Sequence, residues 1–216
     1  MGNAEANTCC WIYNNPEYLG WVQSQLCCTL HLRGKIGCGK SVLTKELLKS
    51  VQRETSILSP QGEKTSVLFY FCSRVNRPAE SASLLLEALI YQYLSKLPWL
   101  FPRILQQTDI LENNPLSGKS VTWSVVSLWK ILVTLLEGSS HASVVFFIDA
   151  LDECDPSSTE AFLVQFKDYH SKGGTPGKSV KFFISSRNSH HIVRGLYYTA
   201  HTFRISITAS MVSPEY

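Results

Sequence analysis

The stretch RGKIGCGKSVL, residues 33–43, contains the full pattern G-x-x-x-x-G-K-S between Gly34 and Ser41. A strand-like run, CTLHLR, precedes it at residues 28–33, and residues 42–54 follow it with apolar side chains at helical spacing. A strand, a glycine-rich turn and a helix in this order aim backbone N–H groups and the helix N-terminus at an anion. The stretch therefore predicts a phosphate-binding loop.

Two further Gly-Lys-Ser tripeptides, at residues 118–120 and 177–179, lack this context. The first has Asn113 where the pattern needs a glycine, and no strand-like run precedes it. The second has Lys172 at that position and leads into a strand-like run instead of a helix, so we interpret both copies as exposed turns. In the copy at residues 39–41, Lys40 is predicted to reach the terminal phosphates and Ser41 to ligate magnesium. The predicted phosphate-binding residues are Gly34, Gly37, Gly39, Lys40, Ser41 and Val42.

Carboxylates follow the apolar run SVVFFID, in which Asp149 is the last residue, and Asp152 and Glu153 come within one turn after it. Ligands bind at the carboxyl ends of strands in an open α/β sheet. Asp149 is therefore a candidate magnesium ligand, and Asp152 or Glu153 is a candidate for orienting or deprotonating an attacking water. A second apolar run, VKFFISS, ends directly before Arg187, whose forked and permanently charged guanidinium suits a γ-phosphate.

Strand-like runs alternate with helical patterns along the chain. The apolar, β-branched and aromatic runs lie at residues 28–33, 66–72, 143–149, 180–185 and 201–207. The helical patterns lie at residues 42–54, 81–97, 122–138 and 157–170, the third with Thr122 as its expected N-cap. Nearly continuous apolarity is typical of strands covered on both faces, so the alternation predicts an α/β fold with a mostly parallel sheet between two layers of helices.

The three motifs, in this order, resemble those of fungal NACHT-type NTPases of the STAND class, in the module known as nephrocystin-3-like N-terminal. The resemblance implies a P-loop NTPase, a three-layer sandwich whose five-stranded, mostly parallel sheet has the order 5-1-4-3-2. It also implies ATP and Mg²⁺ as ligands, low-turnover hydrolysis, and a nucleotide switch in a signalling or innate-immunity-like protein. The segments that carry it are GKIGCGKS (34–41), FFIDALDEC (146–154), KFFISSR (181–187) and TCCWIYNNPEYLGW (8–21).

The segment before the first strand has two interpretations. By the resemblance, Thr8 to Trp11 would lie near the nucleotide base. Alternatively, the segment is an amphipathic helix that packs on the sheet through Trp11, Tyr18 and Trp21. Position by position, the resemblance implies phosphate and magnesium binding at Gly39, Lys40 and Ser41, magnesium support at Asp149, hydrolysis at Asp152 and Glu153, and γ-phosphate sensing at Arg187.

The expected organisation is a single nucleotide-binding domain with two short flanks. We expect an N-terminal segment at residues 1–27, a NACHT-like domain at 28–207 and a frayed tail at 208–216. Family members usually continue into a winged-helix region and long repeats, so we interpret the chain as truncated after the nucleotide-binding core. A sheet that normally packs against a following region would expose apolar surface, so we expect self-association or protein partners.

The composition is that of a globular protein: 216 residues, 44% hydrophobic and 17% charged. The net charge of +3 is too small to predict nucleic-acid binding, and no apolar run is long enough to predict a membrane span. Seven cysteines without a C-x-x-C pair argue against a disulfide framework and a zinc site. They favour a reducing compartment, so we expect a cytoplasmic location.

Two other functions stay open from the sequence. A non-hydrolysing or decayed interaction domain would keep the fold without catalysis, although intact Lys40, Asp149 and Glu153 favour a working site. A small-molecule kinase would need an acceptor pocket, for which the region of Arg74 and Arg77 is a candidate. The absence of an N-K-x-D guanine-reading motif favours ATP over GTP.

We expect Lys40→Ala to abolish nucleotide binding, whereas Lys119→Ala and Lys178→Ala leave the affinity nearly unchanged. The reason is that only Lys40 stands between a strand and a helix with Gly34 in place. Titration of the three purified variants with fluorescently labelled ATP measures the effect. A loss of affinity in either other variant comparable with that in Lys40→Ala would refute the assignment.

Overall fold

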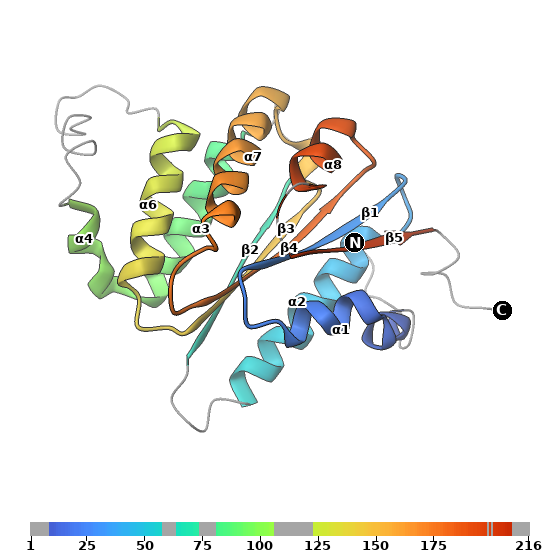
Figure 1. Ribbon diagram of the computed structural model, residues 1–216, viewed down its shortest axis with the longest axis horizontal. Helices are drawn as coiled ribbons and strands as arrows, with labels where there is room; N and C mark the ends of the chain where they lie inside the picture. Colours follow the sequence, from blue (N-terminus) through green and yellow to red (C-terminus); the bar gives the residue numbers. More distant parts are fainter. Residues whose placement is uncertain are drawn as a thin grey trace.

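The computed structural model describes residues 9–57, 64–73, 81–105, 123–197, 199 and 201–208. The strands of these residues form one sheet of order β2-β3-β4-β1-β5, in which every neighbouring pair is parallel. Read from the opposite edge, this is the predicted order 5-1-4-3-2 (Figure 1). The strands are β1 (Cys28–Gly34), β2 (Thr65–Phe71), β3 (Ser143–Asp149), β4 (Ser179–Ser186) and β5 (Thr202–Ile207).

Helices cover both faces of the sheet. Figure 1 shows α3, α6, α7 and α8 on one face and α1 and α2 on the other, which gives the predicted three layers. The longer helices are α1 (Pro16–Gln23), α2 (Lys40–Ile57), α3 (Ala82–Lys96), α6 (Val125–Gly138), α7 (Pro156–Ser171) and α8 (His190–Tyr197). The shorter ones are η1 (Cys10–Asn14), η2 (Pro98–Leu100), α4 (Phe101–Leu105) and η4 (Leu151–Glu153).

Neighbouring apolar residues of the central strands point to opposite faces of the sheet. Phe146 and Phe182 lie in the core beneath α3, α6, α7 and α8, with their ring centroids 4.8 Å apart. Phe147 and Phe183 lie in the core beneath α1 and α2, with centroids 5.2 Å apart. All four side chains are at most 2% exposed. Burial on both faces is the reason that these strands are continuously apolar in the sequence.

The segment before β1 forms a helix that packs on the sheet, as the second of its two interpretations predicted. Asn15 caps α1 by accepting hydrogen bonds from two backbone N–H groups, and Pro16 occupies the first helical position. Trp21 then lies against Phe147 and Phe183, with ring centroids 6.4 Å from each. Thr8, the residue expected near a nucleotide base, lies outside the described residues.

One predicted feature of the helices needs correction, and one helix was missed. The expected cap of the third helix, Thr122, lies outside the described residues, and α6 begins after Ser124, whose side chain accepts from Ser127 N. The eight-residue helix α8 was not predicted, because its His-rich sequence is too short for a clear helical period. No described helix is long and apolar enough to cross a membrane.

Both edges of the sheet are covered by side chains from neighbouring helices. On β2, the side-chain amide of Gln92 accepts from Phe69 N and donates to Phe69 O, and Lys96 donates to Val67 O. On β5, Arg204 N donates to the carboxylate of Glu17. These contacts occupy backbone groups that would otherwise pair with another strand.

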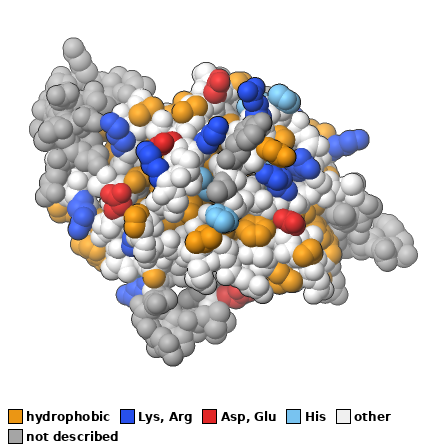
Figure 2. Space-filling model, in the orientation of Figure 1, with side chains coloured by type: hydrophobic (Ala, Val, Ile, Leu, Met, Phe, Trp, Pro, Cys, Tyr) orange, Lys and Arg blue, Asp and Glu red, His pale blue; other side chains and the backbone are white. Residues whose placement is uncertain are grey.

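Figure 2 shows charged side chains interspersed with hydrophobic ones on the side of the molecule that this view presents.

Three buried histidines, His31, His141 and His170, are each bonded to a hydroxyl group of the sheet, and His31 and His170 are the most deeply buried. His170 of α7 is 3.0 Å from the Thr29 hydroxyl, and His31 of β1 is 2.9 Å from the Ser186 hydroxyl. The two histidines are 3% and 1% exposed. Desolvation by burial is the main cause that lowers the pKa of each imidazole to about 4.

We expect the free energy of unfolding to decrease as the pH falls from about 6.5 towards about 4. In this window the unfolded histidines bind protons that the folded ones do not, so protonation favours unfolding. Each histidine contributes at most on the order of 3 kcal/mol across the window. Urea denaturation between about pH 5 and 6.5, where most carboxylates stay ionised, measures the slope. His170→Gln should reduce it; an unchanged slope in this variant would contradict the assignment.

Candidate functional site

The loop between β1 and α2 adopts a backbone that depends on its glycines. Gly37 and Gly39 have positive φ angles of 75° and 86°, a region that side chains with a Cβ rarely adopt. A Cβ on Gly34 would lie 2.7 Å from the backbone oxygen of Ile207, so β5 can approach only a glycine here. The loop passes directly into α2 at Lys40, as the sequence predicted.

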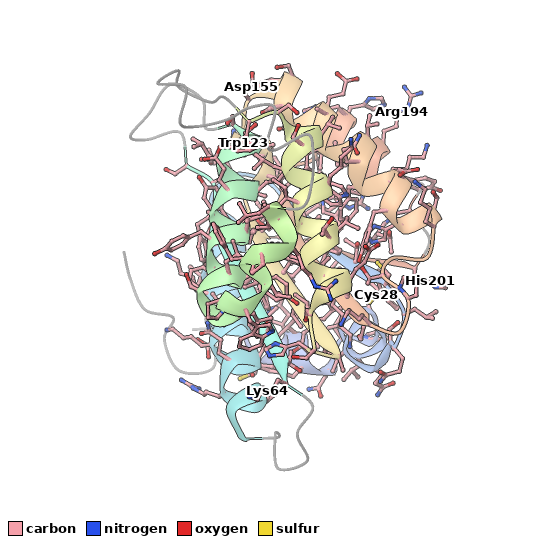
Figure 3. All side chains as sticks on the ribbon, turned by 90° about the vertical axis from the view of Figure 1, so that its left-hand side faces the viewer. Cys28, Lys64, Trp123, Asp155, Arg194 and His201 are labelled. Atoms are coloured by element: carbon pink, nitrogen blue, oxygen red, sulfur yellow. The ribbon has the colours of Figure 1, made fainter. Side chains whose placement is uncertain are left out.

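The loop lines one wall of a cavity of about 300 Å³ at the carboxyl ends of the strands. From this side come Ile36, Gly37, Gly39, Lys40, Ser41 and Val42. The opposite wall consists of Ala150, Asp152, Glu153 and Arg187, which follow β3 and β4. In Figure 3, Lys64, just before β2, lies low in the view, Cys28 and His201, at the starts of β1 and β5, lie near mid-height, and Asp155, after β3, lies at the upper edge. The structure thus brings together residues that the sequence predicted from three separate motifs.

Lys40 is bonded to the loop itself. Its ammonium group donates to the carbonyl oxygens of Gly34, at 2.9 Å, and Lys35, at 2.8 Å. These are neutral acceptors, and a phosphate oxygen with its negative charge is a stronger one. The ammonium therefore stands at the cavity wall with partners that an anion can replace.

Asp149 lies behind the cavity wall, with its side chain tied to two other segments. The residue is 3% exposed and its Oδ1 accepts from Thr44 Oγ1 at 2.9 Å and from Ser185 Oγ at 2.5 Å. The Thr44 hydroxyl also lies 2.9 Å from Lys40 O, so its single hydrogen is shared between the two acceptors. Ser185 Oγ in turn accepts from the backbone N–H of Ala150 at 2.9 Å. One carboxyl oxygen therefore links α2, the end of β3 and β4.

Sequence reasoning missed Thr44 and the conformation of Ala150. Thr44 lies four residues after Lys40, one helical turn on, and this spacing was the available signal. Ala150 has a left-handed backbone, with φ 55° and ψ 46°, which costs a non-glycine residue about 1 kcal/mol. No sequence signal marked it, since Asn and Gly are the residues expected in this conformation.

Arg187 is bonded to both acids of the loop after β3. Its backbone N–H donates to Asp152 Oδ1 at 2.8 Å, its Nε lies 3.1 Å from Asp152 Oδ2, and its guanidinium lies 3.3 Å from Glu153 Oε1. The Asp152 side chain is 5% exposed, that of Glu153 24% and that of Arg187 43%. Asp152 is therefore the more firmly held acid, and Glu153 is the one with more access to water.

Of the other lysines and arginines that the sequence analysis considered, Lys178 is in the described part of the chain and lies away from the cavity. Lys178 donates to the backbone oxygens of Ser139 and His141 at 2.6 and 2.9 Å, just past the end of α6. It is thus half-buried and bonded, which corrects the prediction of a wholly exposed turn. The Gly-Lys-Ser copy at residues 118–120 and the Arg74–Arg77 region lie outside the described residues.

A family model and a known fungal protein each match most of this chain. The family model described as nephrocystin 3, N-terminal, matches residues 7–187. The vegetative incompatibility protein HET-E-1 of Podospora anserina is 25% identical over 198 residues, which are 92% of this chain and 14% of that protein. The chain therefore spans only a small part of this relative's length.

The fold resembles that of the Aeropyrum pernix ORC2 protein, solved in ADPNP and ADP complexes, with a TM-score of 0.50 and 15% identity, over 88% of this chain and 44% of that one. At this identity the likeness concerns the fold alone. A Walker-type ATPase of Pyrococcus abyssi matches with a TM-score of 0.49 and 12% identity, over 88% of this chain and 51% of that one.

We expect Thr44→Val to destabilise the protein by about 1–3 kcal/mol, because it removes a donor to a buried carboxyl oxygen while keeping the side-chain shape. Thr44→Ser, which keeps the hydroxyl, is the matched control and should lose less. Chemical denaturation of both variants gives the difference. Equal stabilities would mean that the hydrogen bond to Asp149 contributes nothing.

Proposed function

Because the chain belongs to the nephrocystin 3 N-terminal family, we propose that it binds ATP with Mg²⁺ and acts as a NACHT-type nucleotide switch with slow hydrolysis. One observation carries the proposal: a single cavity joins Lys40 and Ser41 of the glycine-rich loop to Asp152, Glu153 and Arg187. Two cations, a hydroxyl and two carboxylates around one cavity are groups that can position phosphates, a metal ion and water for phosphoryl transfer.

Phosphate binding is the part of the proposal that the loop supports. The residues Gly34–Ser41 serve as the Walker A motif, and backbone N–H groups at the start of α2 face the anion. Lys40 exchanges its bonds to Gly34 O and Lys35 O for charge-assisted bonds to the terminal phosphates. Nucleotide binding thus replaces contacts inside the loop by contacts to the ligand.

The residues present fit a magnesium ion. Mg²⁺ prefers hard oxygen ligands, and the Ser41 hydroxyl lines the cavity while the Asp149 carboxyl stands behind it. Ser41 would ligate the ion directly and Asp149, whose Oδ1 is already bonded twice, would support it through water. When bound, the ion supplies neutralisation of the phosphate charge.

Arg187 is proposed to respond to the γ-phosphate. Its guanidinium pairs with Asp152 and Glu153, and a γ-phosphate competes for the same planar donors. Loss of the Glu153 contact leaves this carboxylate able to orient the attacking water. The position of the loop after β3 then depends on the nucleotide, which is the property of a switch.

A second candidate is a domain that binds nucleotide without hydrolysing it. The observation in its favour is that both acids of the loop are already paired with Arg187. If the phosphate does not displace this arginine, neither acid can act on water. Both candidates bind nucleotide, and they differ in whether the bound ATP is hydrolysed.

The proposal also covers the domain boundaries, the location and the partners. We take residues 28–207 as the nucleotide-binding domain, 1–27 as the segment before it and 208–216 as a tail. None of the seven cysteines, all in the described part of the chain, forms a disulfide, and we place the domain in the reducing cytoplasm. Nucleotide is the proposed ligand, and self-association or a protein partner would carry the signal.

We expect Glu153→Gln to keep ATP affinity and to lower the single-turnover rate by about 10²–10⁴-fold, because only the group that positions water is lost. Asp149→Asn should instead weaken magnesium-dependent binding. Titration with labelled ATP with and without Mg²⁺, followed by single-turnover hydrolysis, separates the two. Asp152→Asn is the comparison for the neighbouring acid. Normal turnover in all three variants would contradict the roles given to these acids, whereas ATP binding without turnover in the wild-type protein would favour the non-hydrolysing domain.

A further inference from the structure

His31 lies in β1, three residues before Gly34, and is 1% exposed. Strands β1 and β4 are parallel neighbours with His31 opposite Ile184, so Ser186, two residues farther along β4, points to the same side of the sheet. His31 Nε2 and Ser186 Oγ are 2.9 Å apart. The proposed function gives no role to His31 or Ser186.

The direction of this hydrogen bond follows from the second partner of Ser186. Its hydroxyl donates to the backbone oxygen of Arg187 at 2.8 Å. A hydroxyl has one hydrogen, so Ser186 Oγ accepts and His31 Nε2 donates. Burial, together with the charges of Arg33 and Arg204, lowers the pKa of His31 to about 4, so the ring is neutral near pH 7 and carries its proton on Nε2.

Arg187 is therefore held on both sides of its α-carbon. Its carbonyl oxygen accepts from Ser186, and its N–H donates to Asp152 Oδ1 at 2.8 Å. We propose that His31 is a positioning residue that, acting through Ser186, fixes the Arg187 peptide so that the guanidinium faces Asp152, Glu153 and the cavity. The catalytic meaning of this inference rests on the proposed function, whereas the positioning itself concerns only residues of the chain.

The structure offers a matched control for the loss of a buried imidazole. His170 is 3% exposed, is bonded to the Thr29 hydroxyl at 3.0 Å and has its other ring nitrogen 3.0 Å from Phe166 O. It is bonded to Thr29 near the start of β1, whereas His31 lies in the middle of that strand. Replacement of either histidine by leucine removes a buried hydrogen bond, but only His31 is connected to Arg187.

The first test observes Arg187 directly. The ¹⁵N-labelled Nε–H of Arg187, which faces Asp152 at 3.1 Å, is followed by NMR in wild type, His31→Leu, His31→Gln, Ser186→Ala and His170→Leu. We expect the resonance to shift and its solvent exchange to accelerate about fivefold to tenfold in His31→Leu and Ser186→Ala. His31→Gln, which presents an amide N–H in place of Nε2–H, should restore the wild-type signal, and His170→Leu should leave it unchanged.

The second test is kinetic and uses the same proteins. We expect single-turnover ATP hydrolysis to fall about 10–100-fold in His31→Leu and Ser186→Ala, with ATP affinity unchanged because the loop residues that bind phosphate are intact. His31→Gln should recover the rate, and His170→Leu should keep it.

Two results would overturn the proposal: an unaltered Arg187 resonance in His31→Leu, or an equal change in His170→Leu. If the wild-type protein binds ATP without hydrolysing it, the catalytic part of the proposed function fails. The NMR comparison then still decides whether His31 positions Arg187.

Discussion

The hydrogen bonds to Asp149 Oδ1 are the constraint on which the site depends. A carboxyl group that is 3% exposed is costly to bury unless it is bonded, and here hydroxyl groups of Thr44 and Ser185 supply the donors. Thr44 belongs to the helix that follows the glycine-rich loop, and Ser185 belongs to β4. Asp149 Oδ1 therefore holds the helix after the glycine-rich loop, the end of β3 and strand β4 at fixed positions relative to one another.

The strand order makes this arrangement possible. Strand β4 lies between β3 and β1, so Arg187, which follows β4, has the glycine-rich loop on one side and Asp152 and Glu153 on the other. Because parallel strands end at the same edge of a sheet, three stretches far apart in the chain meet at one cavity. An order in which β4 did not lie between β3 and β1 would separate the arginine from one of its two neighbours.

The sequence predicted those parts of the site that are continuous in the chain. The loop at Gly34–Ser41 was visible because its glycines, lysine and flanking elements are consecutive, and both central strands were visible because they are apolar on two faces. The order of the strands came from the resemblance, since crossover connections leave no local pattern. The pairing of His31 with Ser186 was not predictable, because it depends on the register of β1 against β4. The same holds for Thr44 and Asp149.

The hydrogen bonds of the site fall into a fixed and an exchangeable group, and exposure separates them. Asp149 is bonded to residues that are fully buried, and breaking such contacts leaves unsatisfied polar groups in the interior. The contact of Arg187 with Glu153 joins side chains that are 43% and 24% exposed, and ion pairs of this kind contribute only about 0–1 kcal/mol. A phosphate can therefore displace Glu153 from the guanidinium at little cost, while the carboxyl that would support magnesium keeps its place. A nucleotide switch needs this division, since one part must stay still for the movement of the other to depend on the ligand.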